Sequence, residues 1–248
     1  MTTLYSIFTA LTTRAACAIL GSMSTLYMVA TPIGNLEDIT LRAVRILGEA
    51  DTVACEDTRH TSRLLNHLGL KKPLVACYAY DEAKGSARVL GLLAEGRIIA
   101  YCSDAGTPCI SDPGTLLARK AREAGHEVVP IPGPSAFAAL VSAGGVFFKS
   151  VSFEGFLSPK PGRRRSRLEE LMSREEAAVL YESPHRIVKL LADIADIDSE
   201  RYISVGREMT KLHEEFVCGS AQLVHQDYAG RQSIKGEFAV LVSPAKKA

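Results

Sequence analysis

Hydrophobic and polar positions in the first half of the chain alternate between two patterns. Short apolar runs, typical of buried strands, are followed by segments whose apolar residues recur at helical spacing. The runs predict strands at 26–30, 52–55, 74–77, 97–102 and 127–131, with helices between them. Strands and helices joined by such short connections imply right-handed crossovers and a parallel sheet. We therefore expect an α/β domain with a mostly parallel sheet over residues 24–140.

The second half follows a different pattern. Apolar runs predict strands at 151–156, 178–182, 202–205, 215–218 and 238–242. One helix is expected after a basic turn at 159–167, and another is expected to start at Ser183-Pro184, but little helix is expected among the last three strands. Consecutive strands permit hairpins, so this sheet should be mixed or antiparallel. The fold class is thus α/β with two α/β domains, the second spanning residues 141–248 and joined through Gly144-Gly145.

Residues 1–23 do not continue either pattern. They hold one arginine, no acid and several hydroxyls, without the positive start and cleavage region of a secretory signal. Met23 stands directly before the first strand. We read residues 1–23 as a disordered extension outside the fold. No apolar run reaches the roughly 18–20 residues of a membrane span, so no membrane partner is expected.

Composition limits the partners and the compartment. The net charge is +1, so an anionic partner must be met by a local patch rather than by the overall field. Six cysteines show no CxxC pair and no metal-ligand spacing, which favours free thiols and a cytoplasmic protein. His60 and His67 lie seven positions apart without further ligands, so no metal site is predicted.

The segment 103–114, SDAGTPCISDPG, carries the densest candidate chemistry. It lies at the carboxyl end of a predicted strand, which is where ligands bind in open α/β sheets. Asp112 is expected to cap the following helix with Pro113 at its first position, as Asp38 is for the first helix of the domain. Taken alone, the segment is equally consistent with a capped turn and with a ligand-binding loop.

Standard phosphate-binding fingerprints are absent. The first strand ends in ATPIGN instead of a G-x-G-x-x-G turn, and no GxxxxGK[ST] segment occurs. This architecture favours a ligand without a pyrophosphate, held by backbone groups and small side chains. Polar clusters end several predicted strands, at 31–35, 56–59, 103–114, 132–136, 181–186 and 207–211.

Eight ordered segments resemble the tetrapyrrole-methylase superfamily and, within it, the ribosomal RNA small subunit methyltransferase I family. They run from about Leu26 to Val242 and read ATPIGNLEDITLRA, EDTRHTSRLL, SDAGTPCISDPG, PIPGPSA, FEGFL, YESPHR, GREMTK and KGEF. The resemblance implies S-adenosylmethionine-dependent 2′-O-methylation of a cytidine ribose in 16S rRNA of the small ribosomal subunit. It also implies two α/β domains with the cofactor in the cleft between them, and a homodimer.

Carried over residue by residue, the resemblance implies a set of cofactor contacts. These are Pro32, Asp104, Ala105, Gly106, Thr107, Ile110, Ser135, Ala136, Tyr181, Glu182, Arg207 and Gly236. The chain departs from the family at Cys109, where glycine is usual, and the replacement would be benign at a negative φ. The extension has no counterpart in the family, and RNA contacts made by the C-terminal tail of many members would be missing here.

A ribose hydroxyl is a poor nucleophile at neutral pH, so a base or an electrostatic helper is expected. The candidates are Glu56, Asp57 and Glu182, with Glu208 as a further strand-end acid, although each could equally form a salt bridge or a helix cap. Phosphate contacts are expected from the basic residues at 160–167 and from cations at strand ends, unless residues 160–167 are only the solvated start of a helix. They are Arg59, Lys160, Arg163, Arg164, Arg165, Arg167, Arg186 and Lys211.

Two alternatives stay open at this point. One is a non-catalytic RNA-binding assembly factor that has kept the fold. The other is a methyltransferase of a small tetrapyrrole-type substrate, against which the basic run at 160–167 and the EDTRHTSRLL and YESPHR segments weigh. Binding of S-adenosylmethionine would separate an enzyme from an assembly factor.

Overall fold

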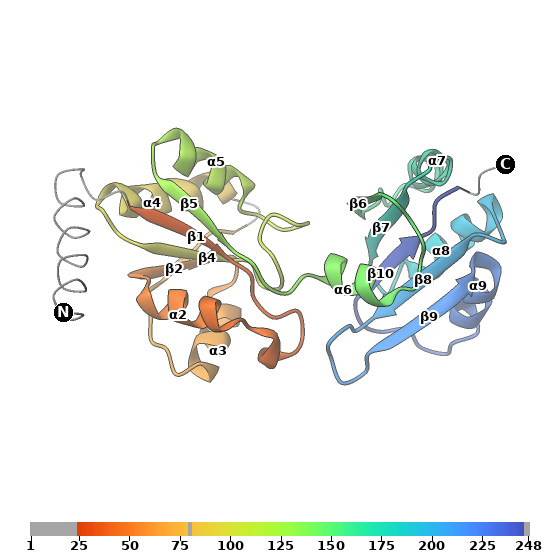
Figure 1. Ribbon diagram of the computed structural model, residues 1–248, viewed down its shortest axis with the longest axis horizontal. Coiled ribbons are helices and arrows are strands. Elements are labelled where there is room, and N and C mark those ends of the chain that lie inside the picture. Colours follow the sequence, from red (N-terminus) through yellow and green to blue (C-terminus); the bar gives the residue numbers. More distant parts are fainter. Residues whose placement is uncertain (1–23, 79–80, 246–248) are drawn as a thin grey trace, which may run out of the picture. The chain divides into compact units, whose positions relative to one another are not determined.

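The computed structural model describes residues 24–78 and 81–245, so the expectation for residues 1–23 lies outside the described part. The chain divides into two compact units (Figure 1). Unit 1 holds residues 24–31 and Ile39–Gly133, and unit 2 holds Pro32–Asp38 and the residues from Pro134 onward. The expected boundary at residue 140 falls inside helix α6 (Ala136–Ala143), which packs in unit 2 through Leu140. The division therefore comes before this helix.

Unit 1 is built on a five-stranded parallel sheet with the order β3-β2-β4-β1-β5, as the alternating pattern predicted. Its strands are β1 (Thr25–Val29), β2 (Thr52–Cys55), β3 (Leu74–Ala76), β4 (Ile99–Cys102) and β5 (Glu127–Ile131). Its helices are α2 (Leu41–Glu49), α3 (Thr58–His67), α4 (Glu82–Ala94) and α5 (Thr115–Glu123).

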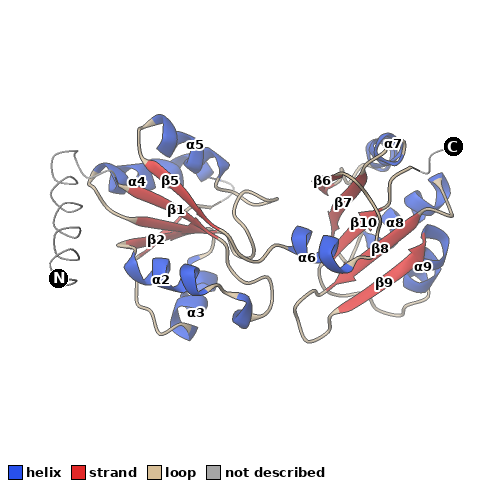
Figure 2. Cartoon of the chain, in the orientation of Figure 1, coloured by secondary structure: helices blue, strands red, loops and turns tan. Residues whose placement is uncertain are grey.

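Helices cover both faces of this sheet (Figure 2). Helices α2 and α3 pack on one face, and α4 and α5 pack on the other. Strands β1 and β4 are neighbours, yet the helices that follow them, α2 and α5, lie on opposite faces. The carboxyl ends of β1 and β4 thus form a topological switch point, where open α/β sheets bind ligands.

The start of α2 corrects one expected cap. Asp38 ends a short 3-10 turn, η1 (Leu36–Asp38), and does not cap the helix. Thr40 is the cap, because its side chain accepts a hydrogen bond of 3.1 Å from the backbone N–H of Ala43. Ile39 and Thr40 lie between this 3-10 turn and α2, where the chain passes from unit 2 back into unit 1.

Unit 2 contains a five-stranded mixed sheet with the order β6-β7-β10-β8-β9. Strands β6 and β7 are parallel, and the remaining pairs are antiparallel, as predicted. The strands are β6 (Val151–Phe156), β7 (Ala177–Glu182), β8 (Tyr202–Arg207), β9 (Glu215–Ser220) and β10 (Phe238–Val242). On one face lie α7 (Pro161–Met172), α8 (Ile187–Ile197) and α9 (Ala221–Ala229), and on the other lies α6.

Three expectations for unit 2 are wrong. Helix α9 was not expected, because only a narrow stripe of Ala221, Val224 and Tyr228 is buried and most of its other residues are polar. Helix α8 begins at Ile187 rather than at Ser183-Pro184, which forms a preceding turn. The basic residues expected in a turn belong to α7 itself, whose first residue is Pro161.

Two chemical features of the described chain can be stated here. The five described cysteines are free thiols, and those at 55, 77 and 102 are buried, as the spacing predicted. Among the helices at 24–78 and 81–245, none is long and apolar enough to cross a membrane.

Candidate functional site

The loop after β4 is hydrogen-bonded to the segment that follows β1. Thr31 and Gly106 form an isolated antiparallel bridge, with N–H to O distances of 2.9 and 3.0 Å in the two directions. The Thr31 hydroxyl also donates to the carbonyl of Ser103 at 3.4 Å. Both polar backbone groups of Gly106 are therefore used inside the protein. Gly106 is buried at a φ of 78°, a conformation that favours glycine.

A second contact joins this loop to the end of β2. Asp104 Oδ1 accepts a hydrogen bond of 2.9 Å from the backbone N–H of Asp57. The sequence-predicted loops after β1, β2 and β4 are thereby brought together at one edge of the sheet, at its switch point. Thr31, which forms the bridge to Gly106, was not among the predicted site residues. Its position directly after the first strand was the available signal.

Negative charge gathers at this edge. Burial raises the pKa of Glu56, and the charges of Asp104, Asp112 and Asp57 raise it further. Burial also raises the pKa of Asp112, which outweighs a hydrogen bond with Ser103, and Asp104 adds to the rise. In the part of the chain that the structure describes, no cationic side chain forms an ion pair with Glu56, Asp104 or Asp112. The edge therefore favours a positively charged ligand.

Asp57 differs from these three carboxylates. Its Oδ1 accepts the N–H of Arg59 at 2.8 Å and so caps α3, and its Oδ2 lies 2.7 Å from Arg59 Nη2. The hydrogen bond from the Arg59 side chain is the largest of the effects that lower the pKa of Asp57 to about 2. Asp57 is thus a weak base whose carboxylate is used in a helix cap, the ordinary role weighed for it above.

Helix α5 begins later than the sequence indicated. Its N-cap position is Gly114, which has no side chain to accept a hydrogen bond from the first turn of the helix. Glu82 on α4 provides that acceptor instead. Glu82 Oε1 accepts the N–H of Gly114 at 2.9 Å and that of Leu116 at 3.2 Å. The expectation that Asp112 caps this helix is therefore wrong. Because a distant residue caps the helix, Asp112 keeps its carboxylate at the strand-end edge.

In unit 2, the end of β7 is anchored by a buried ion pair. The Glu182 side chain is fully buried and lies 3.0 Å from Arg186 Nη2, while its Oε1 accepts the N–H of Ser183 at 2.8 Å. Arg186 also donates to the carbonyl of Leu157 at 2.7 Å, which joins the ends of β6 and β7. The carboxylate of Glu182 is thus occupied in holding the edge together.

The loop after β8 is tightly constrained. Glu208 and Thr210 have φ values of 50° and 68°, and Lys211 Nζ lies 2.9 Å from Glu208 and 2.8 Å from Glu237. Burial would raise the pKa of Glu208, but hydrogen bonds from Lys211 and from the Glu237 backbone lower it overall. Gly236, at φ 102°, has no room for a side chain, because a Cβ would stand 2.5 Å from Glu208 Cγ.

Comparisons with known proteins agree with this architecture. The family model described as Tetrapyrrole (Corrin/Porphyrin) Methylases matches residues 25–224. The "Ribosomal RNA small subunit methyltransferase I" of Borrelia garinii is 45% identical over 88% of this chain and 98% of the relative. The proteins of that name from Xylella fastidiosa and Pseudomonas aeruginosa are 44% and 43% identical, over 89% and 90% of this chain and 82% and 79% of theirs. This chain belongs to the ribosomal RNA small subunit methyltransferase I family.

Solved structures agree with the fold of this family. A cobalt precorrin-4 methyltransferase of cobalamin biosynthesis has a TM-score of 0.66 at 15% identity and covers 90% of this chain and 96% of its own. The uroporphyrin-III C-methyltransferase of Thermus thermophilus has a TM-score of 0.60 at 23% identity, over 88% of this chain and 94% of its own. At these identities the likeness concerns the fold alone.

Cys109, where the resemblance leads us to expect glycine, lies in the left-handed region of backbone conformation. Its φ is 70°, and that of Ser111 is 62°, so two non-glycine residues occupy the left-handed region in one loop. The condition under which the replacement would be benign, a negative φ, is therefore not met. A left-handed conformation costs a residue with a Cβ about 1–2 kcal/mol.

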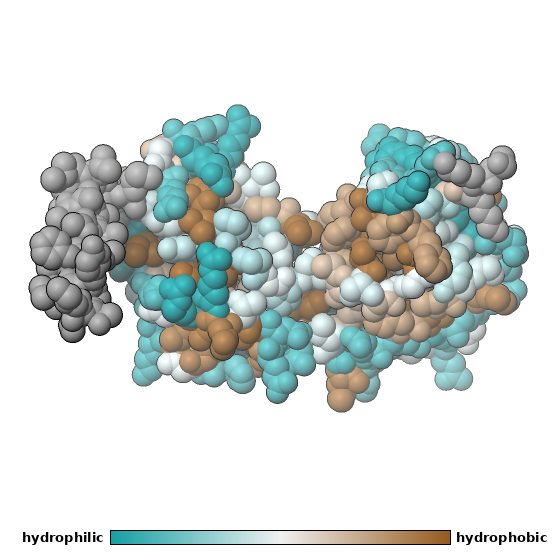
Figure 3. All heavy atoms as spheres, viewed as in Figure 1, coloured by the Kyte–Doolittle hydropathy of each residue, from teal (hydrophilic) through white to brown (hydrophobic). Residues whose placement is uncertain are grey.

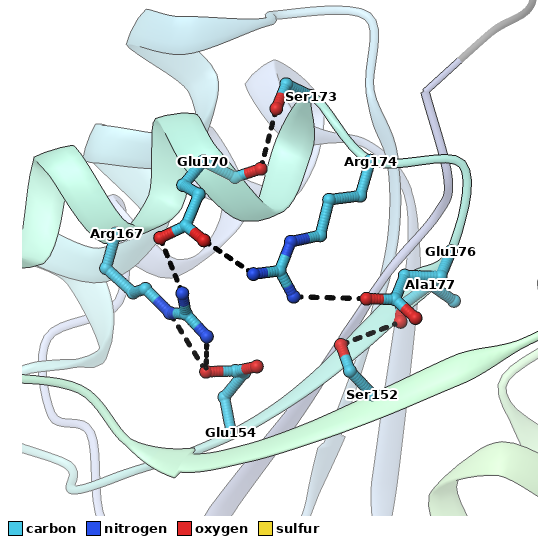
Figure 4. Close-up of polar contacts among 8 residues, drawn as sticks. All are labelled: Ser152, Glu154, Arg167, Glu170, Ser173, Arg174, Glu176 and Ala177. Carbon is cyan, nitrogen blue, oxygen red and sulfur yellow. Dashed lines mark hydrogen bonds and ion pairs between the residues drawn. The ribbon is translucent and has the colours of Figure 1, made fainter.

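The basic residues of α7, predicted as RNA contacts, have different environments. The Arg164 side chain is 6% exposed, with Nε 2.6 Å from Asp193, and this burial disfavours the predicted RNA contact. Arg165 pairs with Glu169 at 3.1 Å, and Arg167 pairs with Glu154 and Glu170 (Figure 4). Lys160 and Arg163 are exposed and form no ion pair with any described residue.

The remaining predicted residues lie at the ends of strands or follow them along the chain. Ser135 and Ala136 are half-buried at the start of α6, and Tyr181 is half-buried at the end of β7. Arg207 donates to the carbonyl of Lys235 at 2.7 Å, so its guanidinium supports the loop before β10. The Arg59 side chain is 87% exposed and its only ion pair among the described residues is with Asp57.

Proposed function

We propose that this protein is an S-adenosylmethionine-dependent methyltransferase that methylates the 2′-oxygen of a cytidine ribose in 16S rRNA of the small ribosomal subunit. The observation that carries the proposal is the cluster of carboxylates at the switch point of unit 1 that form no ion pair with a described residue, in a chain of the methyltransferase I family. Relatives at 41–45% identity carry the ribosomal RNA name, and the tetrapyrrole enzymes support only the fold. This favours RNA over a small tetrapyrrole.

The donor set of unit 1 fits S-adenosylmethionine. The mutual repulsion that helps to raise the pKa values of Glu56 and Asp112 would be relieved by a cation, and this cofactor is a sulfonium cation. When bound, it supplies an electrophilic methyl group. We propose contacts from Asp104 through its carboxylate and from the backbone at Gly106. The further proposed contacts of the loop are Ala105, Thr107 and Ile110. Pro32, in the turn after β1 that belongs to unit 2, is proposed as well.

Residues of unit 2 complete the proposed set of cofactor contacts. Ser135, Ala136 and Tyr181 are partly accessible and can contact a ligand directly. Glu182, Arg207 and Gly236 act through the backbone that they hold, because Glu182 is buried, Arg207 is hydrogen-bonded to Lys235, and a Cβ at Gly236 would meet Glu208.

Among the acids considered, Glu56 is best suited to be the general base. Its carboxylate would accept the proton of the ribose 2′-hydroxyl. S-adenosylmethionine would supply the methyl group to that oxygen and, as its sulfur–methyl bond breaks, leave as a neutral thioether. A raised pKa brings a carboxylate closer to the value at which a base works well near neutral pH. The low pKa of Asp57 and the buried ion pair of Glu182 disfavour those two residues.

Phosphate contacts are proposed for the accessible cations. Arg59, Lys160 and Arg163 are exposed and can meet an RNA backbone without breaking a buried pair. Arg165, Arg186 and Lys211 would first have to leave or share their carboxylate partners. We further propose that the protein acts as a homodimer in the cytoplasm.

Two measurements test the proposed function. Calorimetry with S-adenosylmethionine should show binding to the purified full chain. Small ribosomal subunits from a strain lacking the gene, incubated with the chain and the cofactor, should gain one 2′-O-methyl cytidine when the RNA is mapped. Binding without methyl transfer to RNA would contradict the substrate assignment, and absence of cofactor binding would favour the non-catalytic assembly factor.

A further inference from the structure

Phe156 is an exposed aromatic side chain at the carboxyl end of β6, with 57% of its surface accessible. It is the last member of a row of aromatic rings on the α6 face of the unit 2 sheet. Phe137 and Phe153 are 5.5 Å apart, Phe153 and Tyr181 4.9 Å, and Tyr181 and Phe156 5.9 Å, all edge to face. The other three rings are half-buried, so the row presents Phe156 to solvent in a fixed orientation.

A β-bulge places Phe156 on this face. Phe153 pairs with Val179, but the next pairs are Gly155 with Leu180 and Phe156 with Tyr181, so β6 contains one extra residue. Gly155 has a φ of 61°, the left-handed conformation of a bulge glycine. In a regular strand, Phe153 and Phe156 would point to opposite faces, and Phe156 would be available for burial under the helices. The bulge exposes the ring instead.

The extra residue, Glu154, fixes the neighbouring helix. Figure 4 shows its carboxylate at the guanidinium of Arg167 on α7, with Oε2 at 3.0 Å from Nε and 2.7 Å from Nη2. This contact ties the bulge to α7, whose first turn and preceding residue carry Arg163 and Lys160. The exposed ring is therefore followed, after a short connection, by two cations that have no ion-pair partner in the described chain.

The surface around β6 combines apolar and positive groups. Figure 3 shows hydrophobic residues gathered over β6 and the segment before it in unit 2, beside hydrophilic α7. Single-stranded nucleic acids are bound in this way, because an aromatic ring stacks on a base while cations meet the phosphates. A subunit interface would bury the ring but would also have to desolvate Lys160 and Arg163, which disfavours a second copy as the occupant.

We propose that Phe156 is a stacking platform for an unpaired base of the RNA substrate, with Lys160 and Arg163 binding the adjoining phosphates. This proposal rests on the proposed function for the identity of the substrate. Phe156 would position the RNA, and it belongs neither to the proposed cofactor contacts nor to the candidate bases. The proposal rests on an exposed ring placed by a bulge and followed, four and seven residues later, by two exposed cations without an ion pair among the described residues.

The test measures RNA binding by fluorescence anisotropy with a short labelled oligocytidylate and the purified full chain. Phe156→Leu keeps the apolar bulk without the ring and should weaken binding about tenfold, whereas Phe156→Trp should retain it. Phe147→Leu is the matched control, since Phe147 is 96% exposed but precedes β6 at its other end. The Lys160→Ala, Arg163→Ala double variant should reduce the salt dependence of log Kd by roughly 1.4, two single-strand phosphate contacts.

Three results would overturn the proposal. They are unchanged RNA binding by Phe156→Leu, an equal loss in the Phe147→Leu control, and a changed cofactor affinity or particle mass in Phe156→Leu. The last result would place Phe156 at the cofactor or in a subunit interface. Anisotropy does not require methyl transfer, so RNA binding by Phe156 can fail while the wild-type chain still methylates RNA. The proposed function can likewise fail while the stacking contact is measured.

Discussion

Gly34 and Lys211 pack so closely in unit 2 that Gly34 has no room for a side chain. A Cβ on Gly34 would stand 2.4 Å from Lys211 Cγ and 2.9 Å from Thr210 Oγ1. Lys211 cannot simply turn aside, because its amine is paired with both Glu208 and Glu237. The turn after β1 and the loop after β8, two of the family's motifs, thus depend on each other for their conformation.

We expect Gly34→Ala to lower the free energy of unfolding by about 1–3 kcal/mol, because the methyl group displaces Lys211 from its ion pairs. Urea denaturation measures the effect. In a Lys211→Ala background the same change should cost at least about 1 kcal/mol less. Gly162→Ala is the control, since nothing lies within 4 Å of its added Cβ and alanine favours a helix. Strict additivity of the Gly34 and Lys211 changes would contradict the packing argument.

Cys109→Gly should stabilise the protein by about 1 kcal/mol. The φ of 70° strains a residue with a Cβ, and glycine removes this strain while giving back part of the gain as entropy in the unfolded chain. Cys109→Ala is the informative comparison. It retains the strained φ and loses the hydrogen bond between the thiol and Thr115, so it should not stabilise. Thermal unfolding of the wild type, Cys109→Gly and Cys109→Ala measures the difference. Equal melting temperatures for the two variants would show that the backbone at Cys109 is not strained.

Glu56→Gln should lower methyl transfer about a hundredfold or more while leaving cofactor binding measurable, because glutamine cannot accept the hydroxyl proton. In the wild type, activity should fall as the pH drops through the raised pKa of Glu56. A methylation assay across pH, with single-turnover rates, measures both effects. A variant that keeps wild-type rates would exclude Glu56 as the base.

The same variant should be more stable than the wild type at neutral pH. A carboxyl whose folded pKa is raised contributes stability below its unfolded pKa and loses it as the pH rises through the folded value. Removing the charge therefore helps at pH 7, and the difference should vanish below about pH 4. Asp57→Asn is the control of opposite sign, since the pKa of Asp57 is lowered to about 2 and its ionised form stabilises the fold at neutral pH.

Adjacent arginines on α7 should behave differently. Arg164→Ala leaves Asp193 without its partner at a buried position and should cost about 3 kcal/mol of stability. Arg163→Ala removes an exposed side chain that pairs with no described acid and should change stability by no more than about 0.5 kcal/mol. Chemical denaturation of both variants checks the contrast. Equal costs would show that burial of Arg164 contributes nothing.

Much of the fold could be predicted because hydrophobic patterning is local. Strands β5, β6 and β10 occupy the predicted residues, since short apolar runs have few alternatives inside a sheet. Helix starts were predicted less well. Asp38 and Asp112 looked like caps, yet Thr40 and the distant Glu82 provide the acceptors. Any Ser, Thr, Asp or Asn near a helix start can cap it, and the choice depends on neighbours brought near by folding.

The sequence by itself determined the α/β class, the parallel and mixed sheets and the family motifs that end the strands. These follow from residue periodicity and from residue types that are visible one segment at a time. Only the tertiary structure decided what each motif residue does. In the folded protein Thr31 bridges Gly106, and Asp57 caps a helix. Glu56 lies among like charges. Arg164 is buried, whereas its neighbour Arg163 is exposed. The reason is physical, because hydrogen bonds, burial and charge repulsion depend on distances between segments that lie far apart along the chain.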